Sequence, residues 1–265
     1  RRVLGAALGE ARRLRPVEGP LYAGTSATGS CGGVLDVTSE HENGVTDYVV
    51  TFQDFCVSGE QGDMTWDGVM VGKEIGTPSD SGPVIKAFEM ETQGAVQVVT
   101  GAETVSFEIA GARADYGDPQ AWYPGTPTEE KPNVVKVDTI EVTRTGSGET
   151  YTLTGLHYET VGAFLTTQVE VVGGMLEGPN GSVRVRTEEG APLAVMLAGG
   201  SVNAGGLVLQ GAKDTEVIVA PVEGEMGVVG ITVNGAPYAD RLDCADALGP
   251  TAELVMAVAG ALPIY

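Results

Sequence analysis

The sequence predicts an all-β protein: an antiparallel β-sandwich or roll of two β units, preceded by a short N-terminal helix. Short runs rich in Val and Thr recur about every ten residues, turn signals separate them, and no helical pattern lies between them. Gly accounts for 39 of the 265 residues, about twice its usual share. This abundance favours the tight turns of antiparallel sheets.

Residues 1–15 predict an amphipathic helix. Apolar residues recur at three- and four-residue spacing and form one stripe, and Pro16 ends the helix. We define residues 1–16 as the N-terminal arm, in which the predicted assembly residues are Arg1, Arg2, Val3, Leu4, Leu8, Arg12, Arg13 and Leu14. A helix this short is marginal in water by itself, so its stripe is expected to pack on another surface.

Strand patterns fill most of the chain after Pro20. The predicted strands are 45–55, 63–71, 83–91, 95–100, 104–109, 134–143, 150–156, 163–172, 182–187, 193–198, 206–209, 216–220 and 228–233. Three Asn-Gly pairs, Asn43-Gly44, Asn180-Gly181 and Asn234-Gly235, are typical of two-residue type I′ hairpin turns.

Residues 116–132 differ from both neighbouring regions because they contain four prolines and three aromatic residues. We interpret them as a connection between β domain 1 (17–115) and β domain 2 (133–250). The apolar segment 251–265 follows the second domain. A single continuous sheet spanning both β units is the alternative.

Cys31, Cys56 and Cys244 are the only cysteines. A hairpin turning at Asn43-Gly44 would bring Cys31 and Cys56 together, so we predict a disulfide between them and an oxidising compartment. Two buried free thiols are the alternative. Cys244 is left over, either buried or paired between molecules. Because no Cys-x-x-Cys pattern occurs and His41 and His157 are isolated, no transition-metal site is predicted.

Several segments of the sequence form a recognisable set: Cys31-Gly32-Gly33, Phe52-Gln53-Asp54-Phe55-Cys56, the strand-ending Gly68, and the runs 181–187, 192–193 and 207–211. Together they cover about half of the chain and resemble uncharacterised secreted β-rich proteins and lipoproteins of Gram-negative bacteria. The resemblance implies an exported β-rich protein and no particular activity. No lipid-bearing cysteine stands at residue 1, so a lipid anchor is not carried over.

The charge is divided unevenly along the chain. Residues 1–15 hold five arginines and one glutamate, a net charge of +4, whereas the other 250 residues carry −25. An acidic body argues against nucleic acid and against an anionic membrane surface as partners. No apolar run is long enough for a transmembrane helix. The remaining partners are cations, basic proteins and the arm of another copy.

No catalytic motif or cofactor loop is recognised, so the prediction is a non-enzymatic protein without a cofactor. Tyr116, Trp122 and Tyr123 are candidate ligand aromatics, for stacking on a glycan or anchoring a protein. The alternative is that they cover the seam between the two domains. Asp240, Asp243 and Asp246 form a weak calcium candidate if they lie on a helical turn, and a solvated acidic face is the alternative.

The C-terminal segment is apolar and uncharged. Its predicted assembly residues are Leu254, Val255, Val258, Leu262 and Ile264. They form either this chain's last strand or a strand that completes a neighbour's sheet.

Together these features predict a self-assembling subunit of a bacterial surface filament or array, after removal of an upstream secretion signal. The expected location is extracellular or on the cell surface, with the periplasm as an alternative. The rival functions are a cell-surface binding module for a glycan or protein, and a plain monomeric periplasmic or secreted β protein.

Overall fold

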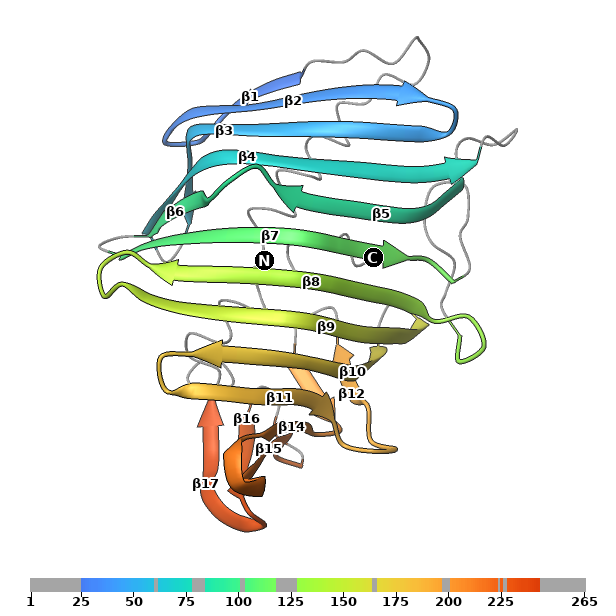
Figure 1. Ribbon diagram of the computed structural model, residues 1–265, viewed down its shortest axis with the longest axis vertical. Coiled ribbons are helices and arrows are strands. Elements are labelled where there is room, and N and C mark those ends of the chain that lie inside the picture. The colour runs from blue at the N-terminus through green and yellow to red at the C-terminus, as the bar shows by residue number, and fades with distance from the viewer. Residues whose placement is uncertain are drawn as a thin grey trace.

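The protein is built almost entirely of antiparallel β-strands. The computed structural model describes residues 25–59, 62–77, 84–100, 103–117, 128–163, 166–196, 201–223, 225 and 228–243. All named strands in this part of the chain belong to one sheet (Figure 1). The all-β, antiparallel prediction is confirmed, and the predicted N-terminal helix lies outside the described residues.

The sheet has 17 strands and one short 3-10 turn at Ala212–Asp214. The strands are β1 (Thr25–Thr28), β2 (Gly32–Glu42), β3 (Val45–Gly59), β4 (Gly62–Thr77), β5 (Val84–Thr92), β6 (Val96–Thr100), β7 (Glu103–Asp115), β8 (Asn133–Arg144), β9 (Glu149–Ala163), β10 (Thr166–Gly178), β11 (Gly181–Thr187), β12 (Leu193–Met196), β13 (Ser201–Ala204), β14 (Leu207–Gln210), β15 (Glu216–Pro221), β16 (Val228–Val233) and β17 (Ala236–Asp243).

The strands follow one another as a meander along the longest axis of the molecule (Figure 1). From β1 to β10 each strand pairs with the next, except that β5 and β6 together fill the place of one strand between β4 and β7. Strand β10 then pairs with β11 at one end and with β12 at the other. The long axis is therefore the direction in which hydrogen bonding adds strands.

The predicted connection between two β units joins neighbouring strands of one sheet. Strand β7 pairs with β8 from Val105↔Arg144 to Asp115↔Val134, although the two strands belong to different predicted units. The structure thus has the alternative arrangement, a single continuous sheet.

Two of the predicted hairpin turns have the expected backbone. Asn43 and Gly44 have φ of 51° and 80°, and Asn234 and Gly235 have φ of 49° and 76°, as a type I′ turn requires. The third hairpin, between β10 and β11, is different because Gly178 pairs with Gly181. Its central residues are therefore Pro179 and Asn180.

One face of the sheet carries the hydrophobic core. Along β8 buried and exposed residues alternate, as expected for a strand with one solvated face. Most of the buried apolar residues form one cluster: Leu35, Val37, Val50, Phe52, Phe55, Trp66, Met70, Phe88, Met90, Val96, Phe107, Ile109, Ala112, Ala114, Val135, Val137, Ile140, Val142, Leu153 and Tyr158.

In the middle of several strands, the alternation of buried and exposed residues shifts by one position. In β3, Phe52 and Phe55 are both buried, and Asp54 between them has a left-handed backbone with φ of 48°. Gly111 in β7 and Gly155 in β9 are exposed and also left-handed, with φ of 62° and 60°. An extra left-handed residue of this kind keeps the same face of the strand directed at the core on both sides of the bulge.

Candidate functional site

Three groups of side chains stand out on the sheet: a disulfide near one edge, a row of charges on the outer face, and polar residues within the core face. The disulfide joins Cys31, just before β2, to Cys56 in β3, with 5.1 Å between their Cα atoms. This confirms the predicted pairing and fits an oxidising compartment.

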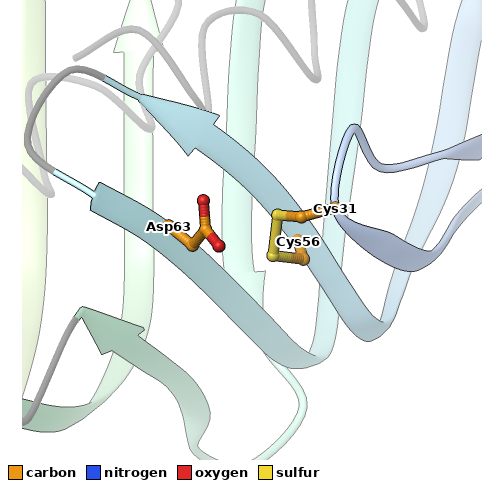
Figure 2. A group of neighbouring side chains, drawn as sticks. All are labelled: Cys31, Cys56 and Asp63. Atoms are coloured by element: carbon orange, nitrogen blue, oxygen red, sulfur yellow. A yellow bond between two sulfur atoms is a disulfide. The ribbon is translucent and has the colours of Figure 1, made fainter.

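Asp63 lies beside the disulfide (Figure 2). One of its carboxylate oxygens and the two sulfur atoms all lie within 4.8 Å of one another. Because the two sulfur atoms are bonded to each other, they are not available as thiolate ligands for a metal ion. The group is instead an exposed disulfide with a negative charge next to it.

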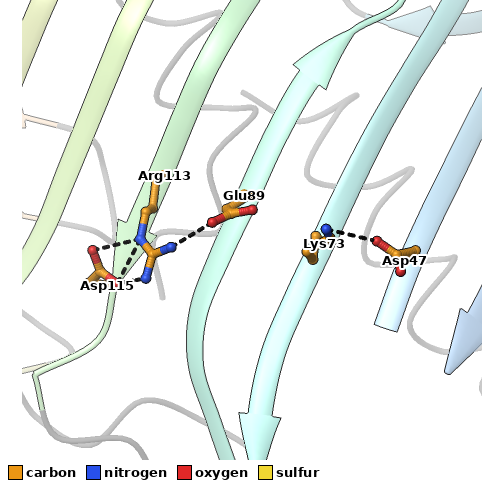
Figure 3. Close-up of polar contacts among 5 residues, drawn as sticks. All are labelled: Asp47, Lys73, Glu89, Arg113 and Asp115. Atoms are coloured by element: carbon orange, nitrogen blue, oxygen red, sulfur yellow. Dashed lines mark hydrogen bonds and ion pairs between the residues drawn. The ribbon is translucent and has the colours of Figure 1, made fainter. Parts of the chain in front are cut away.

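The outer face carries a row of ion pairs across β3, β4, β5 and β7 (Figure 3). Lys73 Nζ lies 3.5 Å from Asp47 Oδ1. Arg113 binds Asp115, with Nη2 2.6 Å from Oδ1, and also contacts Glu89 Oε1 through Nη1. The strand register places Asp47 opposite Lys73, Lys73 opposite Glu89 and Glu89 opposite Arg113.

Arg113 is the centre of this row. Its hydrogen bond to Asp115 raises the pKa of the guanidinium, and Glu89 adds to the effect. The side chain is 44% exposed, so solvent screens these pairs and each contributes little. Lys136 is directly opposite Arg113 on β8, and like charges in that position repel.

We expect Arg113→Met to lower the free energy of unfolding by about 0.5–1 kcal/mol at low salt, because it removes both ion pairs. The loss should shrink at high ionic strength. Lys136→Met is the matched control: it removes a cation of the same row and should leave stability unchanged or slightly higher. Urea unfolding of both variants at low and high salt measures the difference, and equal losses would contradict the ion-pair account.

Polar groups also occur within the core face. Tyr48 Oη donates a hydrogen bond of 2.7 Å to Glu74 Oε2, and the Glu74 residue is buried. This bond satisfies one oxygen of a carboxylate that burial would otherwise destabilise. Asn133 is likewise buried, and its Oδ1 accepts a hydrogen bond from the Gly117 N–H.

Tyr158 differs from these residues, as does the buried Trp66, whose Nε1 has no hydrogen-bond partner within the described residues. The Tyr158 hydroxyl is buried and has no hydrogen-bond partner within the described part of the chain. Burial raises the pKa of Tyr158, and the neighbouring Tyr116 raises it further. The unfolded chain loses the tyrosine proton above about pH 10, whereas the folded protein keeps it to a higher pH. The free energy of unfolding is therefore unaffected by this group below about pH 10 and falls as the pH rises above that value.

Tyr158→Phe should therefore keep or raise stability by up to about 1 kcal/mol at pH 8, because no hydroxyl is left without a partner. Between pH 9 and 11 the variant should lose less stability than the wild type. Tyr238→Phe removes a hydroxyl from a residue that is 77% exposed and serves as the control. Urea unfolding across this pH range tests the prediction, and parallel pH profiles for all three proteins would refute it.

A shallow hollow of about 150 Å³ lies between β9, β10 and β11. Tyr151, Leu176 and Val183 line it, together with the turn residues 178–181. It is smaller than the 300–1,000 Å³ that drug-sized ligands generally occupy, and no charged side chain lines it. Asn180 is the one amide side chain in its lining.

The structure assigns places to only some of the residues predicted from the sequence. Tyr116 packs against the core cluster, which argues against a role in ligand stacking. Asp240 and Asp243 belong to strand β17, so the helical turn on which the calcium candidate depended is not formed there. The other predicted residues lie outside the described part: the N-terminal arm, Trp122, Tyr123, Cys244, Asp246 and the C-terminal segment.

Sequence reasoning did not predict Asp63 or Arg113 as members of a site. The disulfide beside Asp63 and the Glu89 partner of Arg113 lie on other strands, and the register of the sheet brings them together.

Among the described residues, no helix is both long and apolar enough to cross a membrane. Comparisons of the chain with known protein families, with curated proteins and with solved structures found no match.

Proposed function

We propose that this protein is a non-enzymatic, exported structural subunit that assembles with copies of itself into a filament or array. The observation that carries the proposal is the edge of the sheet at β1 and β2, which the described residues leave partly unpaired. Strand β1 covers only residues 34–37 of β2. Among the described residues, no strand pairs with residues 38–42 of β2 on that side.

An unpaired strand edge offers a row of backbone N–H and C=O groups to another chain. Adding a strand from a second molecule is a common way for such an edge to bind a partner. Because the meander already grows along the long axis of the molecule (Figure 1), a strand added at this edge extends the same sheet. Contacts of this head-to-tail kind generate fibres when they do not close into a ring.

The charge distribution supports the same proposal. The net charge of the whole chain is −21, yet residues 1–15 carry +4. The arm of one copy is therefore attracted to the acidic body of another. Salt screens such an attraction, so the apolar stripe of the arm supplies most of the binding free energy, and the arginines direct the arm to its place.

The experiment compares assembly of four proteins by electron microscopy and sedimentation velocity. Deletion of residues 1–15 should abolish assembly, and so should the variant Leu4→Ser/Leu8→Ser, which interrupts the apolar stripe. The variant Arg12→Gln/Arg13→Gln keeps the stripe and should assemble more slowly than the wild type, with a weaker dependence on salt. Intact fibres formed by the deletion variant would refute the role of the arm.

A further inference from the structure

The turn between β1 and β2 is fastened to the end of β3. Cys31 N–H donates a hydrogen bond of 3.2 Å to the carbonyl of Cys56, and the Ser58 N–H donates one of 2.8 Å to Ser30 Oγ. The disulfide adds a covalent bond between the same two segments. Strand β1 ends three residues before Cys31 and otherwise joins the sheet through only four paired positions on β2.

We propose that the Cys31–Cys56 disulfide is a redox-sensitive latch that holds the edge strand β1 on the sheet, and that Asp63 protects this latch from thiols. Reduction of the bond releases β1 and uncovers residues 34–37 of β2, which β1 covers in the oxidised protein. This inference concerns a single molecule and holds whether or not the chain assembles.

The disulfide is accessible to reagents in solution. Cys31 is exposed, Cys56 is half-buried and Asp63 is exposed. Figure 2 shows the three side chains together, with Asp63 on β4 and the bridge between β3 and the turn that joins β1 to β2. Since Ser58 is opposite Asp63 in the β3–β4 register, the hairpin fixes the carboxylate near the sulfur atoms.

The chemistry of reduction explains what Asp63 does. A thiolate attacks one sulfur atom of the bridge, which breaks the S–S bond, forms a mixed disulfide and expels the other cysteine as a thiolate. A second thiol then attacks the mixed disulfide, releases the second cysteine and leaves as the oxidised reagent. Two thiols thus supply the two electrons and become a disulfide themselves.

The carboxylate of Asp63 opposes the first step in two ways. It repels the incoming thiolate, and it raises the free energy of the thiolate that leaves. A unit charge at about 5 Å in a water-like medium changes a rate by about fourfold. The bridge is therefore reduced more slowly than an equally exposed disulfide without a neighbouring anion.

The first test measures the rate at which dithiothreitol and glutathione reduce the bridge in the full-length protein. Asp63→Asn should be reduced about fourfold faster than the wild type, and added salt should narrow the gap. Glu170→Gln, which removes an exposed carboxylate from the distant strand β10, should react at the wild-type rate. Equal rates for Asp63→Asn and the wild type would overturn the protective role.

The second test measures hydrogen exchange of the backbone amides in residues 34–37. In the reduced wild type, with its thiols alkylated, the amides in this range that point toward β1 should exchange faster than in the oxidised protein. The amides that point toward β3 and those of β8 should not change. Cys31→Ser/Cys56→Ser provides a second reduced state without alkylation. If residues 34–37 keep their protection in the reduced wild type, the disulfide is not a latch on β1.

Discussion

Replacement of Gly33 by alanine is expected to destabilise the protein by about 3 kcal/mol or more. A Cβ atom at this position would lie 1.9 Å from the carbonyl oxygen of Asp54, which is a backbone atom. The residue also has a left-handed backbone, with φ of 68°, which costs a non-glycine residue about 1–2 kcal/mol. Relief of the contact requires β2 and β3 to move apart at the bulge, and urea unfolding measures the cost.

Gly148→Ala is the matched control for this prediction. Gly148 has nearly the same backbone, with φ of 71°, but a Cβ atom there meets nothing within 4 Å. Its loss should be about 1–2 kcal/mol, the conformational cost alone. The excess loss in Gly33→Ala then reports the close approach of β2 to Asp54. Equal losses in the two variants would show that the approach is not tight.

The second large effect is expected for Ile140→Ala in β8. Ile140 has 0% exposure, and the register places it between Ile109 on β7 and Leu153 on β9, which are both buried. The truncation leaves a cavity between strands that cannot close without disturbing the ladder. We expect a loss of about 3–4 kcal/mol in the free energy of unfolding.

Val172→Ala tests whether this loss reflects burial. Val172 is 50% exposed, so its truncation should cost no more than about 0.5 kcal/mol. Ile140→Val keeps most of the volume and should cost about 1 kcal/mol. Urea unfolding should show the largest loss of stability for Ile140→Ala, a smaller loss for Ile140→Val and the smallest loss for Val172→Ala. A loss below about 1 kcal/mol for Ile140→Ala would mean that the core face is not closely packed around β8.

Most strands were predictable because local patterns determine them. Val228–Val233 matches its predicted bounds, and every other predicted run overlaps a described strand. Four described strands, β1, β2, β13 and β17, lie outside the predicted runs, and β1 and β13 have weak signals. Strand β1 has no β-branched apolar residue, and β13 consists of Ser, Val, Asn and Ala. Both take their conformation from the neighbour with which they pair.

The arrangement of the strands was less predictable because it depends on contacts between distant residues. A Pro-rich segment between two strands is compatible with a domain linker and with a long connection inside one sheet, and the pairing of β7 with β8 decides between them. The left-handed Asp54 was also not foreseen. Aspartate adopts this backbone only occasionally, so its sequence neighbours do not reveal it.

The candidate site also combines a feature that local sequence predicts with contacts that only the strand register determines. The Cys31–Cys56 pair follows from a hairpin turn that the local Asn43-Gly44 signal predicts. The position of Asp63 beside it depends on the β3–β4 register, and the contact of Arg113 with Glu89 joins residues 24 apart in the chain. Charged residues at exposed strand positions look alike in the sequence, and only the register selects which of them meet.

The central proposal is that copies of the chain join through the open edge of the sheet. Hydrogen exchange of the backbone amides in residues 38–42, measured over a series of protein concentrations, tests it most directly. We expect the amides in this range that point away from β3 to become protected as the concentration rises, while the amide of the exposed turn residue Gly235 continues to exchange rapidly. Exchange at 38–42 that is the same in dilute and concentrated protein would contradict the proposal.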